Sequence, residues 1–227
     1  MYSNRRIFLQ QSFGVTCASF IGRRTGFAVL QSPVGQATTG ASGAALIGRM
    51  TWLNPPASFS RSGDKVVVRS RGKTDFWRKT FNDSIADNGH FFSLPADGDF
   101  TFQARVNGQY AAEFDQAGLM VRLDANNWMK CGTELFQARR NASVVFTRDF
   151  SDWSIMPYPS ESAGVWWRAA RSKNSIEVFC SLDGKEFRLV RSGYFPPGGR
   201  IDAGIMCAAP TGPGFEAVFD ELKLDMA

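Results

Sequence analysis

The sequence predicts an all-β protein, and three observations support that fold class. Apolar and polar residues alternate with a period of two in run after run from Ser58 onward, as they do in strands that are buried on one face. Turn-forming residues such as Asn107-Gly108 and Asp183-Gly184-Lys185 separate these runs. No stretch after residue 50 repeats its apolar residues at the spacing of a helix.

The predicted strands are too numerous for one open sheet, so we expect two packed antiparallel sheets, a jelly-roll β-sandwich. In the run from Phe100 to Val106, for example, every second residue is apolar. No linker or internal repeat interrupts residues 50–227, which therefore form one expected domain. The remaining expected strands lie near 65–70, 75–80, 115–123, 128–136, 142–150, 163–172, 176–182, 185–192, 201–208 and 215–225.

Residues 1–49 differ in charge from the rest of the chain. They hold five of the 26 basic residues and no acidic residue, which leaves 21 basic against 21 acidic side chains in residues 50–227. A neutral body lacks the basic surface that binds phosphates, so we expect no nucleic-acid partner. Arg5-Arg6 followed by Ile7-Phe8-Leu9 resembles a twin-arginine export signal. We therefore expect residues 1–49 to be a leader or disordered extension, with a mature start between residues 28 and 50 and a periplasmic or extracellular location.

Two alternatives to export stay open. The segment also has the composition of an organellar transit peptide, or it precedes a true start at Met50 in a cytoplasmic protein. The uncharged residues 12–22 are too few to span a bilayer, which takes about 20 residues, so we expect no membrane anchor. Cys131, Cys180 and Cys207 fit the core, with a disulfide between two of them as an option in an exported protein.

The hairpin at residues 115–136 has a register that can be derived. Directly paired residues point to the same face, so the apolar faces of the two strands coincide only if the paired numbers have an even sum. A three-residue loop, Asp124-Ala125-Asn126, meets this condition if Asn126 adopts the left-handed conformation. The expected core-facing pairs are Val121/Met129 and Leu119/Cys131. The expected pairs on the other face are Arg122/Trp128, Met120/Lys130 and Gln116/Glu134.

That second face is the candidate ligand site. Its indole, amide and charged groups are those with which proteins hold sugars and other polyhydroxylated ligands. The alternative is an ordinary solvated face with a salt bridge from Lys130 or Arg122 to Glu134. The candidate ligand-binding residues on this concave sheet are Gln116, Arg122, Trp128, Lys130 and Glu134, joined by Trp166 and Arg168 from strand 163–172 and by the rim residues His90, Asp75, Trp77, Asp152 and Trp153.

Few catalytic arrangements are compatible with the sequence. His90 is the only histidine, and no Gly-x-Ser-x-Gly elbow, zinc-ligand spacing or phosphate-binding loop is present. We therefore expect no metal and no cofactor. Paired carboxylates are the device that remains, with Glu134 and a partner such as Asp75, Asp149 or Asp152.

Five sequence blocks together resemble the DUF1349 family, over nearly all of residues 52–225. The resemblance implies a concanavalin A-like lectin/glucanase sandwich, and the fungal branch of the family is named for regulation of enolase. The Glu-x-Asp-x-x-Glu motif of the laminarinase-like relatives is not found, since Glu216 to Glu221 has a different spacing. The blocks are Thr74-Asp75-Phe76-Trp77, Asn88-Gly89-His90-Phe91, Asp115 to Val121, Trp128-Met129-Lys130 with Glu134, and Ser151-Asp152-Trp153-Ser154.

Three functions are consistent with these observations. The first is a non-catalytic module that binds carbohydrate or a similar polyhydroxylated ligand. The second is a glycoside hydrolase or lyase that uses Glu134 and a second carboxylate. The third is a structural or protein-interaction sandwich without a small ligand. The oligomeric state and the identity of the ligand are not predicted.

Overall fold

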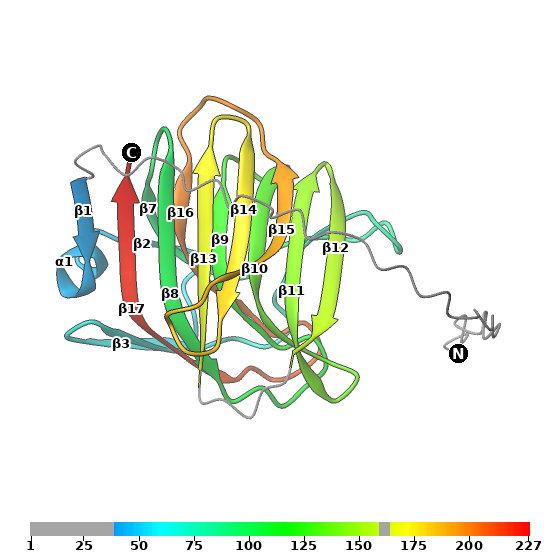
Figure 1. Ribbon diagram of the computed structural model, residues 1–227. Coiled ribbons are helices and arrows are strands. Elements are labelled where there is room, and N and C mark those ends of the chain that lie inside the picture. Colours follow the sequence, from blue (N-terminus) through cyan, green and yellow to red (C-terminus); the bar gives the residue numbers. More distant parts are fainter. Residues whose placement is uncertain (1–38, 159–163) are drawn as a thin grey trace, which may run out of the picture. The chain divides into compact units, whose positions relative to one another are not determined.

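The computed structural model describes residues 39–158 and 164–227, in which two sheets of antiparallel strands pack face to face (Figure 1). This arrangement confirms the predicted all-β sandwich. Sheet A has the strand order β15 (Arg188–Tyr194), β14 (Ser175–Ser181), β13 (Val165–Ser172), β8 (Phe100–Gly108), β17 (Glu216–Met226), β4 (Lys65–Arg69) and β3 (Ser58–Ser62), with β1 (Thr39–Ser42) paired to β17. Sheet B has the order β12 (Phe150–Pro157), β11 (Arg139–Arg148), β10 (Asn127–Phe136), β9 (Gln116–Arg122), β16 (Asp202–Ala208), β7 (His90–Pro95) and β2 (Thr51–Leu53).

The main core lies between the two sheets. Alternate residues of each strand point into it, as Phe102, Ala104 and Val106 do from β8 and Trp167 does from β13. Each large apolar side chain buried in this way stabilises the fold by about 1.5–3 kcal/mol. The three cysteines of the described residues are free thiols, so the optional disulfide is not formed.

The sandwich begins before Met50, which corrects the expected boundary. Strand β1 pairs with β17 from Thr39 to Ser42, and the short helix α1 (Gly43–Ile47) follows it. Leu46 and Ile47 of this helix are buried in the main core. The segment 39–49 therefore belongs to the folded domain, and a start at Met50 would remove part of it. The twin-arginine pair lies outside the described residues.

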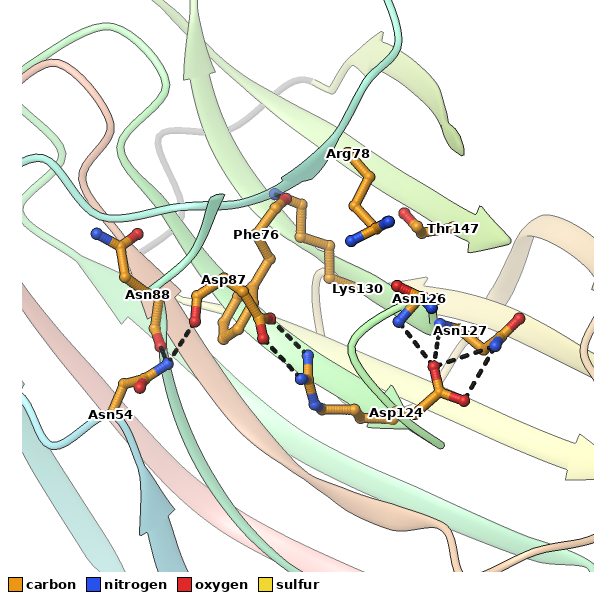
Figure 2. A network of polar contacts seen from close by, with 12 residues as sticks. Asn54, Phe76, Arg78, Asp87, Asn88, Asp124, Asn126, Asn127, Lys130 and Thr147 are labelled. Carbon is orange, nitrogen blue, oxygen red and sulfur yellow. Dashed lines mark hydrogen bonds and ion pairs between the residues drawn. The ribbon is translucent and has the colours of Figure 1, made fainter. Parts of the chain in front are cut away.

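The register of the hairpin formed by β9 and β10 is confirmed. Trp128 pairs with Arg122, Lys130 with Met120 and Glu134 with Gln116. The loop consists of the expected three residues, but Asn126 does not adopt a positive φ angle. Instead, the Asp124 carboxylate accepts hydrogen bonds from the backbone N–H groups of Asn126 and Asn127, which closes the turn (Figure 2).

A small separate hairpin covers part of sheet B on the side away from the main core. Its strands are β5 (Phe76–Arg78) and β6 (Ile85–Asp87), which pair only with each other. We call residues 75–89 the cover segment. Phe76 is fully buried in a second apolar cluster, which also contains Phe91, Met120, Trp128, Val145, Met206 and Ala208. The expected strand at 75–80 therefore forms a layer outside the sandwich. No helix in the described part of the chain has the length and apolarity needed to cross a membrane.

Candidate functional site

The side of sheet B that points away from the main core, its outer face, carries five of the predicted residues. Alternation along β9 and β10 places Gln116, Arg122, Trp128, Lys130 and Glu134 there, as the derived register requires. The face is not open, however, since Trp128 is 0% exposed and Lys130 and Glu134 are each 4% exposed. The expectation of an exposed indole is wrong because the cover segment lies over it.

Arg122 and Trp128 hold the cover segment. The Arg122 guanidinium forms a bidentate pair with the Asp87 carboxylate, at 2.7 and 2.8 Å. The Phe76 ring packs edge-on against Trp128, at a centroid distance of 6.2 Å. Asn54 donates hydrogen bonds to the backbone carbonyls of Asp87 and Gly89, which also hold the C-terminal end of the segment (Figure 2). Arg122 and Trp128 were predicted to contact a ligand, but in the structure both contact the cover segment of the same chain.

A hollow remains on the outer face of sheet B, and we call it the sheet B hollow. Its cavity volume is about 10 Å³, which is close to the size of one water. Gly132 pairs with Gly118 at this point, and a Cβ atom on Gly132 would lie 2.2 Å from the Ala117 carbonyl oxygen. Glycine is therefore required where these strands approach. The lining residues are Gln116, Ala117, Lys130, Cys131, Gly132, Thr133, Ser143 and Met206.

Asp75 from the cover segment reaches the sheet B hollow. The Lys130 ammonium lies 3.0 Å from Asp75 Oδ1 and also donates to the Phe76 carbonyl oxygen at 2.7 Å. Gln116 Nε2 donates to the same Asp75 oxygen at 3.4 Å. The pairs expected between Glu134 and Lys130 or Arg122 are thus replaced by pairs with carboxylates of the cover segment. Of the predicted rim residues, the structure brings Asp75 and Trp153 to the site.

Glu134 is the most perturbed acidic group of this face. Burial raises its pKa to about 7, although the nearby Lys130 charge and a hydrogen bond with Ser143 act in the opposite direction. Trp153 Nε1 lies 3.3 Å from Glu134 Oε2 and 3.0 Å from Ser143 Oγ, so it donates to both. Near pH 7 this carboxyl group is present in both protonation states, and it can donate or accept a hydrogen bond.

Half-buried aromatic side chains adjoin Glu134. The Phe136 ring meets Trp153 at 5.2 Å and Phe114 at 5.7 Å, which forms one aromatic group. The alternation of the sequence did not indicate three further residues of this site, Ser143, Phe114 and Phe136. Extending the register to β11 would have found Ser143, since it pairs with Gly132 and shares its face. Phe114 precedes its strand, so no alternation pattern could place it.

Trp166 and Arg168 do not join this site. Their strand, β13, pairs with β8 and β14 in sheet A, so both side chains point outward on the opposite side of the sandwich. Arg168 donates two hydrogen bonds to Gln103 Oε1. The alternation along the strand was interpreted correctly, but it contains no information about which sheet the strand enters.

His90 and Asp152 also lie away from the sheet B hollow. His90 is buried, and its Nε2 accepts a hydrogen bond from the Arg71 backbone while its Nδ1 donates to the Asn54 carbonyl. Desolvation lowers the His90 pKa, which favours this neutral form. Asp152 pairs with Arg191 of β15 at 2.8 Å. Asp149, the other candidate partner of Glu134, pairs with Arg78 and Lys79.

Known proteins resemble this chain in sequence over most of its length. The family DUF1349, described as a protein of unknown function, matches residues 52–227. Regulation of enolase protein 1 of Saccharomyces cerevisiae is 37% identical over 77% of this chain and 88% of its own length. The uncharacterized protein AN7484 of Emericella nidulans is 27% identical over 70% of this chain and 84% of its own length.

Solved structures share the sandwich. A functionally unknown protein from Saccharomyces cerevisiae has a TM-score of 0.77 and 36% identity, and the match covers 80% of this chain and 98% of that one. The GH43 protein BlXynB of Bacillus licheniformis has a TM-score of 0.61 and 16% identity, over 79% of this chain and 37% of its own. The carbohydrate-binding module CBM66 of Bacillus subtilis has a TM-score of 0.51 and 12% identity, over 77% and 94%. The last two similarities concern the fold alone.

Proposed function

The chain belongs to the DUF1349 family, and from the geometry of the sheet B hollow we propose that it is a non-catalytic module that binds carbohydrate or a similar polyhydroxylated ligand. One observation carries the proposal. A hollow with a glycine floor is lined by the buried polar side chains of Gln116, Lys130 and Ser143, and the buried Glu134 lies beside it, in contact with Ser143 and Trp153. Burying charged groups costs stability unless they are paired, so such a cluster is typical of a binding site. The fold shared with a carbohydrate-binding module supports this proposal.

The dimensions of the hollow restrict the ligand. A cavity volume of about 10 Å³ is far below the roughly 300–1,000 Å³ of pockets that enclose drug-sized molecules, so the hollow itself admits only a single small group. We expect one sugar ring to lie against the rim near Trp153, with a single hydroxyl group in the hollow. Glu134 can accept from that hydroxyl or donate to it, and Gln116 offers an amide beside it.

A glycan array followed by titration calorimetry tests this proposal. Gln116→Ala and Ser143→Ala should each weaken binding of the glycan selected on the array by at least tenfold. Asp152→Asn is the matched control because its carboxylate pairs with Arg191 outside the hollow, and it should bind as the wild type does. Absence of binding to every glycan, with a folded protein, would contradict the proposal and favour the interaction-sandwich alternative.

A catalytic function is the second candidate, and the raised pKa of Glu134 favours it. A carboxyl group with a pKa of about 7 is suited to act as a general acid, and Asp75 supplies a second carboxylate to the same hollow. Hydrolysis of chromogenic aryl glycosides that disappears in Glu134→Gln would establish the enzyme. Glycan binding without any hydrolysis would support the binding module.

A further inference from the structure

We propose that a second ligand site lies on the opposite side of the sandwich, in a hollow on the outer face of sheet A, and that it takes a neutral polyhydroxylated molecule. This sheet A hollow measures about 280 Å³. It lies over three neighbouring strands, β4, β17 and β8, and is distinct from the site of the proposed function. Its lining residues are Lys65, Arg105, Asn107, Val218 and Asp220.

A β-bulge in β17 shapes this hollow. The pairing of β17 with β8 shifts between Asp220 and Lys223, and Glu221 has a φ angle of 52°. Asp220 points to the outer face before the shift, and Glu221 is exposed directly after it. Two consecutive carboxylates thus reach one side of the sheet, which regular alternation forbids. Bulges that redirect side chains in this way are common beside functional sites.

The Arg105 guanidinium is held apart from these carboxylates. Its carbon lies 5.1 Å from the centroid of the Trp166 ring, and Trp166 Nε1 donates to Glu221 at 2.9 Å. Arg105 NH1 remains 3.7 Å from Asp220 and 3.9 Å from Glu221, whereas a close ion pair has a separation of about 2.7–2.9 Å. These are long ion pairs, and polar groups more than about 3.5 Å apart can interact through a bridging hydroxyl group or water.

Further polar groups around the sheet A hollow are not engaged with one another. Asp220 Oδ1 is a buried oxygen without a hydrogen-bond partner among the described residues, while the other carboxylate oxygen of Asp220 is the one that faces Arg105. Asn107 Oδ1 accepts from the Gly108 backbone, which leaves the Asn107 amide nitrogen as the donor on this side. Lys65 acts on Asp220 through its charge but forms no ion pair with it within the described part of the chain.

The mixture of charges selects the class of ligand. Lys65 and Arg105 oppose a cation, and Asp220 and Glu221 oppose an anion. A hydroxyl group both donates and accepts, so a neutral sugar or polyol can bridge the donors and acceptors. Val218 offers apolar surface for its C–H groups. The volume of the hollow, near the lower end of the usual pocket range of about 300–1,000 Å³, suits one sugar unit.

Amide chemical-shift mapping on the full chain tests the proposal. The probes are the methyl glycosides of glucose, galactose, mannose and xylose at millimolar concentrations, with inorganic phosphate as the charged probe. At least one glycoside should shift the amides of Lys65, Asn107 and Val218. Asp220→Ala and Lys65→Ala should each weaken that response at least tenfold. Because Lys65 is exposed, its variant keeps the test valid if Asp220→Ala fails to fold.

Lys223→Ala is the control, since Lys223 is exposed on the same strand outside the hollow, and it should leave the response unchanged. Shifts at Gly118 and Gly132 report the sheet B hollow separately and should persist in the sheet A variants. The proposal would be overturned if no glycoside shifts the three amides, if phosphate shifts them more strongly, or if Lys223→Ala removes the response equally.

Discussion

Glu134→Gln should increase the stability of the protein at neutral and alkaline pH. Burial raises the Glu134 pKa from 4.5 to about 7, so the folded state favours the protonated carboxyl. A folded-state pKa above the unfolded value means that this contribution is complete below pH 4.5 and is lost as the pH rises to about 7. At about 1.4 kcal/mol for each unit of pKa, the loss amounts to about 3 kcal/mol. Glutamine resembles the protonated carboxyl and does not ionise.

Urea unfolding at pH 5, 6, 7 and 8 measures this effect. The variant should exceed the wild type by about 3 kcal/mol at pH 8, and the difference should shrink toward zero near pH 5. Other titrating groups are common to both proteins and cancel in the difference. Glu177→Gln, at an exposed position of β14, should match the wild type throughout. A difference that does not change with pH would refute the assignment of the raised pKa to burial of Glu134.

Three further predictions rest on the fold, and a fourth rests on the sequence of the leader. Trp128→Ala should lower the free energy of unfolding by about 3 kcal/mol or more in chemical denaturation, because the indole is buried against Phe76. A loss below about 1 kcal/mol would mean that the cover segment does not dock. A chain that starts at Met50 should be about 3–6 kcal/mol less stable in thermal unfolding than one that starts at Thr39, because it lacks the buried Leu46 and Ile47. Equal stability of the two chains would exclude α1 from the core. His90 should make a contribution to stability that is lost as the pH falls below 6.5, since protonated His90 cannot accept from the Arg71 backbone. The difference in stability between the wild type and His90→Gln should therefore shrink as the pH falls through this range, and a difference that does not change with pH would contradict this prediction. Replacing Arg5 and Arg6 by lysine should retain the protein in the cytosol if the leader directs export, and fractionation that finds the wild type full-length in the cytosol would favour one of the other locations.

The alternation of apolar and polar residues predicted which face of a strand is buried, but it did not predict which strands are neighbours. The parity of paired residues was sufficient to derive the register of β9 and β10, because a slip of one residue would have turned Leu119 and Met129 out of the core. Alternation also showed that Trp166 points outward. It could not show that β13 lies in sheet A, since strand order depends on contacts between distant segments.

The docking of the cover segment over sheet B could not be predicted from alternation either, because it also depends on contacts between distant segments. Trp128 shares a face with Lys130 and Glu134, and a mixed face of this kind is usually solvated. Its burial depends on Phe76, which lies about fifty residues earlier and approaches from outside the sandwich. Asp75 lies at the site because it belongs to the same cover segment as Phe76. The pairs Arg122–Asp87 and Lys130–Asp75 therefore could not be derived from either strand alone.

The two bonds that Lys130 donates to the cover segment link docking of that segment to occupancy of the sheet B hollow. A ligand that draws the ammonium away from Asp75 and the Phe76 carbonyl would loosen the segment, whereas one that leaves both bonds intact would tighten it. Linkage is reciprocal, so a cover segment that opens more readily would change affinity by the same factor. Protease susceptibility or amide exchange between Arg78 and Asp87 would thus report whether a bound ligand displaces the bonds that Lys130 donates to the cover segment.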